Sequence, residues 1–224
     1  MTNRTAYVLL SGGLDSSVLL RLAKQEFGYN VVAVSLNYGQ RHQNELVSAA
    51  KVAKFYAIRH EVYELPVIGT GGLSDPEFQV PDISYDDIKG ISPTYVPFRN
   101  GLLLSTLASI ASGQLGEKEG ILAYGAHAED AQNWAYPDCT PEFIGAMANA
   151  IFIGSYQRLR LWAPLMNMQK YQIVRVGADL GVPFHLTTSC YKGGDKHCGT
   201  CPTCISRKGA FIRANVPDPT VYAA

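Results

Sequence analysis

Short apolar runs alternate with segments of helical periodicity along most of the chain. The run at Ala6–Leu10 has no polar alternation, which is typical of a strand buried on both faces. Glycines interrupt it, and Ser16–Phe27 then carries apolar residues at helical spacing, with Gly28 as a stop. By the same signals we predict strands at Val31–Asn37, His60–Leu65, Gly120–His127 and Leu159–Leu165, and helices at Gln43–Phe55, Leu102–Ser112, Pro141–Gly154, Gln169–Leu180 and about Thr203–Ala214.

This alternation of strands and helices predicts an α/β fold with a Rossmann-like, doubly wound parallel sheet. The segment Val67–Tyr95 departs from the pattern, because it is rich in glycine and proline and has little periodicity. Such a segment in a compact domain is typical of a functional loop or lid, and an insertion without a role is the alternative. We expect residues 1–183 to form the main domain and residues 184–224 a C-terminal, cysteine-containing segment.

The net charge and the lengths of the apolar runs argue against nucleic-acid and membrane partners. Lys plus Arg number 19 and Asp plus Glu number 19, so the formal net charge is zero. Proteins that hold nucleic acid usually carry a basic excess, which favours a small-molecule substrate and no nucleic-acid partner here. The chain has no apolar run near the length of a membrane span and no signal-peptide pattern. We therefore predict a cytoplasmic protein with no membrane partner.

The segment between the first strand and the first helix predicts an anion-binding loop. Ser11–Ser17 reads Ser-Gly-Gly-Leu-Asp-Ser-Ser, in which two glycines let backbone N–H groups approach a ligand. The following helix adds unpaired donors and partial positive charge at its N-terminus. The string lacks the Gly-Lys-Ser/Thr ending of a Walker A loop and the Gly-x-Gly-x-x-Gly of a dinucleotide site.

Asp15 is the most informative residue of this loop. A carboxylate beside a phosphate is repulsive unless a cation lies between them, so Asp15 is predicted to hold Mg²⁺ on a leaving pyrophosphate. The alternative is that Asp15 only caps the helix.

This string resembles the loop of the pyrophosphatase-loop (PP-loop) N-type ATP pyrophosphatases. The resemblance implies an adenine nucleotide alpha hydrolase-like fold, cleavage of ATP between its α and β phosphates, and adenylation of a substrate oxygen. Pro164-Leu165 followed by Lys170 is similar to a second segment of the class, in which the lysine neutralises the pyrophosphate. It implies catalytic roles for Asp15 and Lys170. The ATP-binding residues expected on this basis are Leu10, Ser11, Gly12, Gly13, Leu14, Asp15, Ser16, Ser17, Val18, Leu19 and Leu20.

Four of the five cysteines cluster near the C-terminus, which predicts a metal site. Cys190, Cys198, Cys201 and Cys204 are separated by seven, two and two residues, and four thiolates at such spacing can enclose a tetrahedral Zn²⁺. An iron–sulfur cluster is the alternative. With all four positions filled by protein, the zinc is expected to be structural, in a small knuckle followed by a helix. Cys139 stands apart and is expected to be a small buried apolar residue.

Four further segments narrow the resemblance to one family. Taken in order, these segments are Asn37–His42, Tyr95–Asn100, Tyr136–Phe143 and Ser189–Cys204. Together they resemble the 7-cyano-7-deazaguanine synthase (QueC) family over nearly the whole chain. The resemblance implies that ATP adenylates 7-carboxy-7-deazaguanine, that ammonia gives the amide, and that a second ATP leads to the nitrile. It also implies a homodimer with one structural zinc in each subunit.

The substrate-binding residues that we predict are polar residues near strand ends and the motifs above. They are Tyr38, Arg99, Asp130, Asp138 and Glu142. An ionised carboxylate suits the donor N–H groups of a deazaguanine, and Arg99 suits a carboxylate or a phosphate. Helix capping is the alternative for Asp138. Arg41 and His42 are weaker candidates, and the alternative for each is a solvated loop residue with no role in binding.

Three other functions remain open at the level of sequence. A PP-loop enzyme of this kind could stop at the amide or join the activated deazaguanine to another molecule. It could instead sulfurate tRNA, with Cys139 as the sulfur carrier, although the neutral charge argues against an RNA substrate. A zinc-binding module on an inactive nucleotide fold is the non-enzyme alternative, against which the intact Ser11–Ser17 loop argues.

Overall fold

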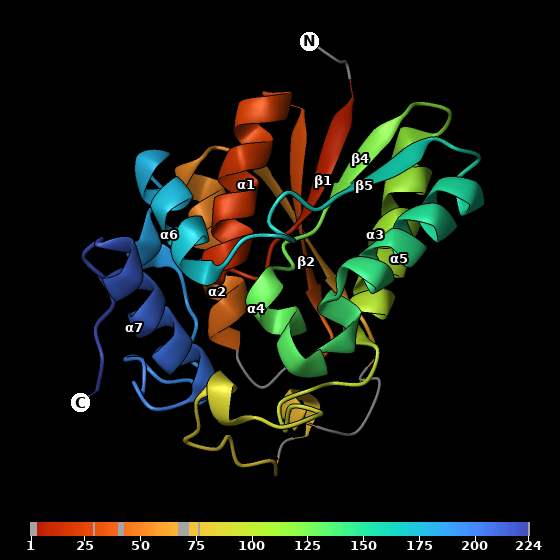
Figure 1. Cartoon of the computed structure of the whole chain (residues 1–224). Coiled ribbons are helices and arrows are strands. Elements are labelled where there is room, and N and C mark those ends of the chain that lie inside the picture. Colours follow the sequence, from red (N-terminus) through yellow and green to blue (C-terminus); the bar gives the residue numbers. More distant parts are fainter. Residues whose placement is uncertain (1–3, 29, 40–42, 67–71, 76, 224) are drawn as a thin grey trace.

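The computed structural model describes residues 4–28, 30–39, 43–66, 72–75 and 77–223. Its centre is a parallel sheet of five strands in the order β3-β2-β1-β4-β5 (Figure 1). The strands are β1 (Thr5–Leu9), β2 (Val31–Asn37), β3 (Arg59–Glu64), β4 (Gly120–Ala123) and β5 (Leu159–Trp162). In register, Val8 lies opposite Ala33 on one side and Ala123 on the other. This confirms the predicted doubly wound α/β fold.

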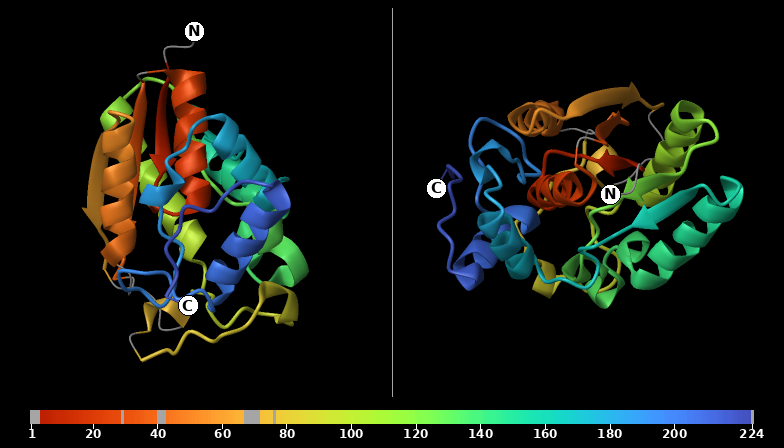
Figure 2. Two further views of the ribbon diagram at one scale, coloured as in Figure 1. Left: turned by 90° about the vertical axis from the view of Figure 1, so that its left-hand side faces the viewer. Right: turned by 90° about the horizontal axis from the view of Figure 1, so that it is seen from above.

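Helices cover both faces of the sheet, and each face has its own apolar core (Figure 2). The helices are α1 (Leu14–Phe27), α2 (Gln43–Phe55), α3 (Arg99–Leu115), α4 (Ala128–Ala131), α5 (Pro141–Gly154), α6 (Lys170–Asp179) and α7 (Pro202–Ala214). Ala6 and Val8 belong to the core that includes residues of α1, α2, α6 and α7, whereas Tyr7 belongs to the core that includes residues of α3 and α5. The two faces are filled by alternate residues of one strand because successive side chains of a strand point in opposite directions.

Several element boundaries differ from those predicted. Strand β4 ends at Ala123 and not at His127, because its neighbour β5 ends at Trp162, opposite Ala123, and β1 ends at Leu9, one residue beyond the partner of Ala123. Helix α3 begins at Arg99 because the Asp138 carboxylate accepts a hydrogen bond from a backbone N–H in its first turn. Five short 3-10 turns were not predicted: Gly72–Ser74, Tyr85–Asp87, Gln132–Trp134, Pro137–Cys139 and Phe184–Leu186.

The topology places a binding site at one end of the sheet. The connection from β1 leads through α1 to β2, whereas β4 lies on the other side of β1, so the strand order reverses between β1 and β4. Ligands of open α/β sheets bind at such a point, outside the carboxyl ends of the strands. In Figure 1 these ends face the segment drawn in yellow, within which Leu73 and Ile88 are buried. No described helix is both long and apolar enough to cross a membrane.

Candidate active site

The loop between β1 and α1 is closed into a turn by its own serines. The Ser11 hydroxyl lies 3.0 Å from the Ser16 hydroxyl and accepts a hydrogen bond from the Gly13 N–H at 3.3 Å. The Ser17 hydroxyl donates to the Gly13 carbonyl at 2.7 Å. These bonds fix the backbone at the start of α1, where the first N–H groups have no helical partner and are available to an anion.

Gly12 shows why this loop requires glycine. Its φ is +84°, and a Cβ at this position would lie 2.3 Å from the Glu45 carbonyl oxygen and 2.5 Å from the Ala49 nitrogen. Any side chain would therefore push the loop away from α2. The Thr188 N–H donates to the Gly12 carbonyl at 2.9 Å, so the segment before the cysteines also holds the loop in place.

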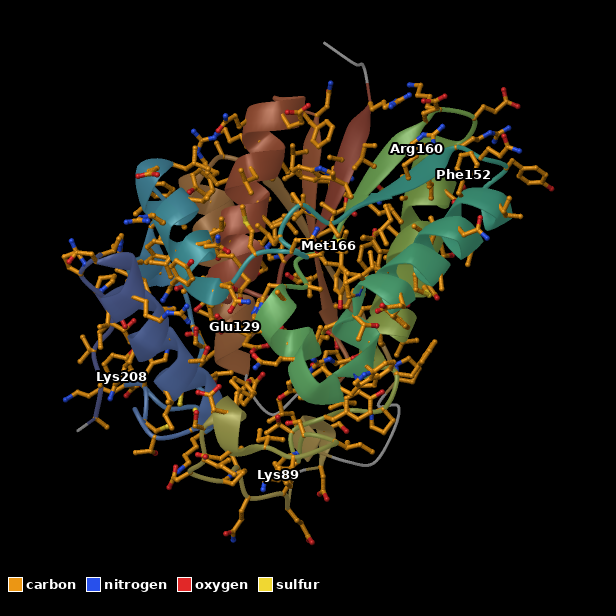
Figure 3. The ribbon with its side chains drawn as sticks, in the orientation of Figure 1. Lys89, Glu129, Phe152, Arg160, Met166 and Lys208 are labelled. Carbon is orange, nitrogen blue, oxygen red and sulfur yellow. The ribbon has the colours of Figure 1, made fainter. Side chains whose placement is uncertain are left out.

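Asp15 and Lys170, predicted as catalytic residues, meet at the mouth of this loop. The Lys170 Nζ lies 3.3 Å from Asp15 Oδ2. Lys170 is only 6% exposed, although it is the first residue of α6. Its position follows from a capping box between Gln169 and Gln172 and from its own N–H, which donates to Glu129 Oε1 at 2.9 Å. Figure 3 labels Glu129 on α4, the helix that supplies this contact.

His127 joins this pair, and sequence reasoning missed it. Its Nε2 lies 3.6 Å from Asp15 Oδ2, 3.3 Å from Asp130 Oδ2 and 3.4 Å from the Lys170 Nζ. Its side chain is 1% exposed, and Nδ1 has no hydrogen-bond partner in the described part of the chain. The one signal that the sequence offered was its place just beyond a buried strand, where functional residues of parallel sheets gather.

Asp15 and Lys170 each stabilise the charged form of the other. Burial raises the pKa of Asp15, but the neighbouring Lys170 and His127 outweigh it and hold that pKa well below its usual range. Burial lowers the pKa of Lys170, and Asp15 and Asp130 outweigh that effect, so its pKa is raised. Asp15 is therefore a carboxylate and Lys170 an ammonium at neutral pH. Asp15 Oδ1 is buried without a hydrogen-bond partner among the described residues, which leaves one oxygen available to a cation.

A pocket of about 230 Å³ opens beside this cluster, at the carboxyl ends of β1, β2 and β4. Of the predicted ATP-binding residues, Leu10, Ser11, Gly13, Asp15 and Ser16 line it. Of the predicted substrate-binding residues, Tyr38, Arg99 and Asp130 line it. Arg99 Nη1 donates to the Tyr38 hydroxyl at 3.3 Å, and its guanidinium lies 6.0 Å from the centre of the Tyr38 ring. The pocket thus joins a phosphate loop to a cationic, aromatic wall.

Asp138 and Glu142, also predicted to bind substrate, are not among the residues that line this pocket. Asp138 is buried, and its Oδ2 accepts a hydrogen bond from the Asn100 N–H at 3.0 Å. This hydrogen bond caps a helix, as the alternative for Asp138 predicted. The helix that it caps is α3 and not α5, which follows Asp138 in the sequence. Glu142 is exposed in the first turn of α5. Arg41 and His42 lie outside the described residues.

We expect Asp138→Ala to lower the free energy of unfolding by about 1–3 kcal/mol, the usual cost of leaving a buried donor unpaired. Urea unfolding of the variant and of Glu142→Ala, which removes an exposed carboxylate, measures the difference. A variant with unchanged stability but a raised KM for substrate would contradict the capping role and favour direct binding.

The four predicted ligands of the metal site come together beside α7. The sulfur atoms of Cys190, Cys198, Cys201 and Cys204 all lie within 4.8 Å of one another, and none forms a disulfide. Four thiolates at such distances suit a tetrahedral ion with metal–sulfur bonds of about 2.3 Å. His197 is not in this group, and its Nε2 accepts a hydrogen bond from the Ser189 N–H at 3.0 Å. The four cysteines can fill all the coordination positions of a tetrahedral metal ion, which leaves no position for a substrate.

Cys139 lies apart from the metal group, against the pocket. It is buried, and burial raises the pKa of its thiol far above the usual range. The Asn100 side-chain amide donates to its sulfur at 3.3 Å. A thiol with so high a pKa is a poor nucleophile, which argues against a sulfur carrier.

The fold and the loop define a Rossmann-like α/β protein of the PP-loop type. The chain belongs to the QueC family: residues 5–215 match the family described as "Queuosine biosynthesis protein QueC". It is 43% identical over 220 residues to the 7-cyano-7-deazaguanine synthase of Caldicellulosiruptor bescii, with 97% of this chain and 96% of that protein covered. It is 41% identical over 229 residues to the 7-cyano-7-deazaguanine synthase of Thermoplasma acidophilum, with 99% and 93% covered.

A similar solved structure is that of the U34-tRNA thiolase NcsA from Methanococcus maripaludis with its [4Fe-4S] cluster. Its TM-score is 0.53 and its identity 15%, and the match covers 96% of this chain and 67% of that chain. At this identity the likeness concerns the fold alone. The match to named synthases over nearly the full length confirms the predicted family and an enzyme of queuosine biosynthesis. It disfavours both the tRNA sulfurtransferase and the inactive binding module.

Proposed function

We propose that this enzyme converts 7-carboxy-7-deazaguanine and ammonia to 7-cyano-7-deazaguanine, with ATP as the activating cosubstrate. The observation that carries the proposal is the pairing of a buried Asp15 and Lys170 beside an intact phosphate loop and a pocket. The curated relatives named as 7-cyano-7-deazaguanine synthases support it.

The reaction uses two adenylations in sequence. A carboxylate oxygen of the acid attacks the α phosphate of ATP and releases pyrophosphate, and ammonia then displaces AMP to give the amide. The amide oxygen attacks a second ATP, and loss of AMP together with the amide protons leaves the nitrile. A carboxylic acid and an amide place their oxygens almost identically, so one phosphate loop can serve both steps.

The residues of the phosphate loop and α6 have distinct roles in this proposal. The N–H and hydroxyl groups of Ser11–Ser17 hold the phosphates, and the Lys170 ammonium neutralises the leaving pyrophosphate. Asp15, with its unpaired Oδ1, would hold Mg²⁺. When bound, this ion reduces the repulsion between the carboxylate and the phosphates and stabilises the leaving group.

The substrate side of the pocket and the metal complete the proposal. Arg99, Tyr38 and Asp130, which all line the pocket, would bind the deazaguanine acid, and Asp138 and Glu142 remain predicted contacts that lie outside this lining. The cysteine cluster would hold one structural Zn²⁺ in each subunit of a homodimer, with no nucleic-acid partner. The division of the chain at residues 183 and 184 also stays a prediction.

The number of AMP molecules released per nitrile tests whether this chain performs the whole reaction. We expect two AMP per nitrile from the acid with ammonia, and one from the amide without ammonia, because each adenylation releases one AMP and the same site accepts the amide as a substrate. Mass spectrometry of the product and chromatography of AMP give both ratios. One AMP per product from the acid, or no turnover of the amide, would favour the alternative enzyme that stops at the amide or transfers the deazaguanine to another molecule.

A further inference from the structure

We propose that Glu45 recognises the deazaguanine, with its side-chain carboxylate accepting hydrogen bonds from the two adjacent N–H donors of the pairing edge. Glu45 lies in the first turn of α2 and lines the pocket. The inference rests on the proposed function and adds a specificity-determining residue to it.

The backbone of Glu45 is fixed relative to the phosphate loop. A Cβ on Gly12 would lie 2.3 Å from the Glu45 carbonyl oxygen, so the loop and the first turn of α2 are in direct contact. A shift of α2 would therefore move the loop as well. This contact gives Glu45 a defined place relative to the phosphates, as a group that selects a substrate requires.

Among the described residues, three carboxylates line the pocket, and two of them already have partners. Asp15 lies 3.3 Å from Lys170, and Asp130 lies 3.3 Å from His127. The Glu45 carboxylate forms no hydrogen bond or ion pair within the part of the chain that the structure describes. Burial raises its pKa to about 7, an effect that Arg99 opposes. Among the described residues this carboxylate has no donor that would stabilise its charge, and a ligand with N–H donors would supply one.

The chemistry of the two purines in the reaction decides which of them suits Glu45. A deazaguanine presents two neighbouring donors, its ring N–H and its 2-amino group, and an ionised carboxylate accepts from both. The adenine of ATP presents one amino donor beside a ring nitrogen lone pair, which repels a carboxylate. An ionised Glu45 is therefore complementary to the deazaguanine and not to the adenine.

Arg99 supplies the opposite charge on the same pocket. It lines the pocket with Glu45, but no ion pair within the described residues joins them. A guanidinium suits the carboxylate of the acid, and Glu45 suits the donor edge on the other ring. A ligand that carries both an anionic and a donor edge satisfies the two side chains at once, which is what 7-carboxy-7-deazaguanine offers.

Glu45→Gln tests this assignment against the parent enzyme, and Glu26→Gln, an exposed residue of α1, serves as the matched control. We expect kcat/KM for the acid to fall by about 100-fold in Glu45→Gln, because an amide cannot accept from both donors and its NH₂ group opposes one of them. The KM values for ATP and for ammonia should stay within about twofold of the parent. Isothermal titration of the acid without ATP gives the same loss in binding, and thermal unfolding verifies that the variant is folded.

A substrate without the 2-amino group, 7-deazahypoxanthine-7-carboxylic acid, identifies the contact itself. The parent should discriminate against it by about 100-fold, and Glu45→Gln should lose most of that discrimination. Unchanged discrimination, or a rise in KM for ATP or ammonia in place of the acid, would overturn the role of Glu45 while the proposed function stands. No AMP release by the parent with the acid would overturn the proposed function and this inference together.

Discussion

Asp15→Asn is expected to lower the rate of AMP formation by about 1,000-fold, a loss typical of removing a preorganised charged group from an active site. The Asp15 carboxylate pairs with Lys170 at 3.3 Å, and its other oxygen has no hydrogen-bond partner among the described residues. A neutral amide is a poor Mg²⁺ ligand and no longer balances the buried ammonium. The measurement is AMP release from the acid at saturating ATP.

The structure also weakens the alternative in which Asp15 only caps α1. The N-cap position belongs to Gly13, and Asp15 lies within the helix. Asp179→Asn, which removes an exposed carboxylate at the end of α6, is the matched control and should retain parent activity. Far-ultraviolet circular dichroism should show Asp15→Asn to be folded. A folded variant with activity within a few-fold of the parent would rule out the role of Asp15 in holding a metal.

Cys201→Ala is expected to have the largest effect on stability, because it removes a ligand of the proposed zinc. Structural zinc in small peptides contributes about 10–16 kcal/mol of binding free energy at neutral pH, and this energy is part of the free energy of folding. Cys201 is fully buried and immediately precedes α7. We expect loss of one equivalent of zinc and a marked fall in the unfolding temperature, measured by elemental analysis and calorimetry.

The effect should extend beyond the metal site. The buried Arg207 of α7 donates to the Phe184 carbonyl at 3.1 Å and to the Thr187 hydroxyl at 2.8 Å. The backbone N–H of Thr188, which follows Thr187, donates to the carbonyl of Gly12 in the phosphate loop. Loss of the metal should therefore weaken ATP binding as well. Cys139→Ala is the control and should retain the zinc. Iron in place of zinc, or a metal-free Cys201→Ala protein as stable as the parent, would contradict this prediction.

The sequence by itself determined the features that depend on short stretches of chain. The order of strands and helices followed from local periodicity, and the Ser11–Ser17 loop and the cysteine spacing each carry their chemistry within a few residues. The structure agrees with these predictions because a tight turn or a two-residue gap between ligands leaves few other geometries. The motifs spread along the chain also sufficed to predict the family.

The tertiary structure alone decided how residues from different elements meet. His127 and Glu45 belong to no motif that a short sequence could reveal, and each acquires its surroundings only when β4 pairs with β1 and the first turn of α2 packs against the loop at Gly12. Asp138 stood in a motif of the family, yet folding placed its carboxylate on the first turn of α3. Such positions depend on burial and on contacts between distant segments, because the environment of a charge is set by what packs around it and not by its neighbours in sequence.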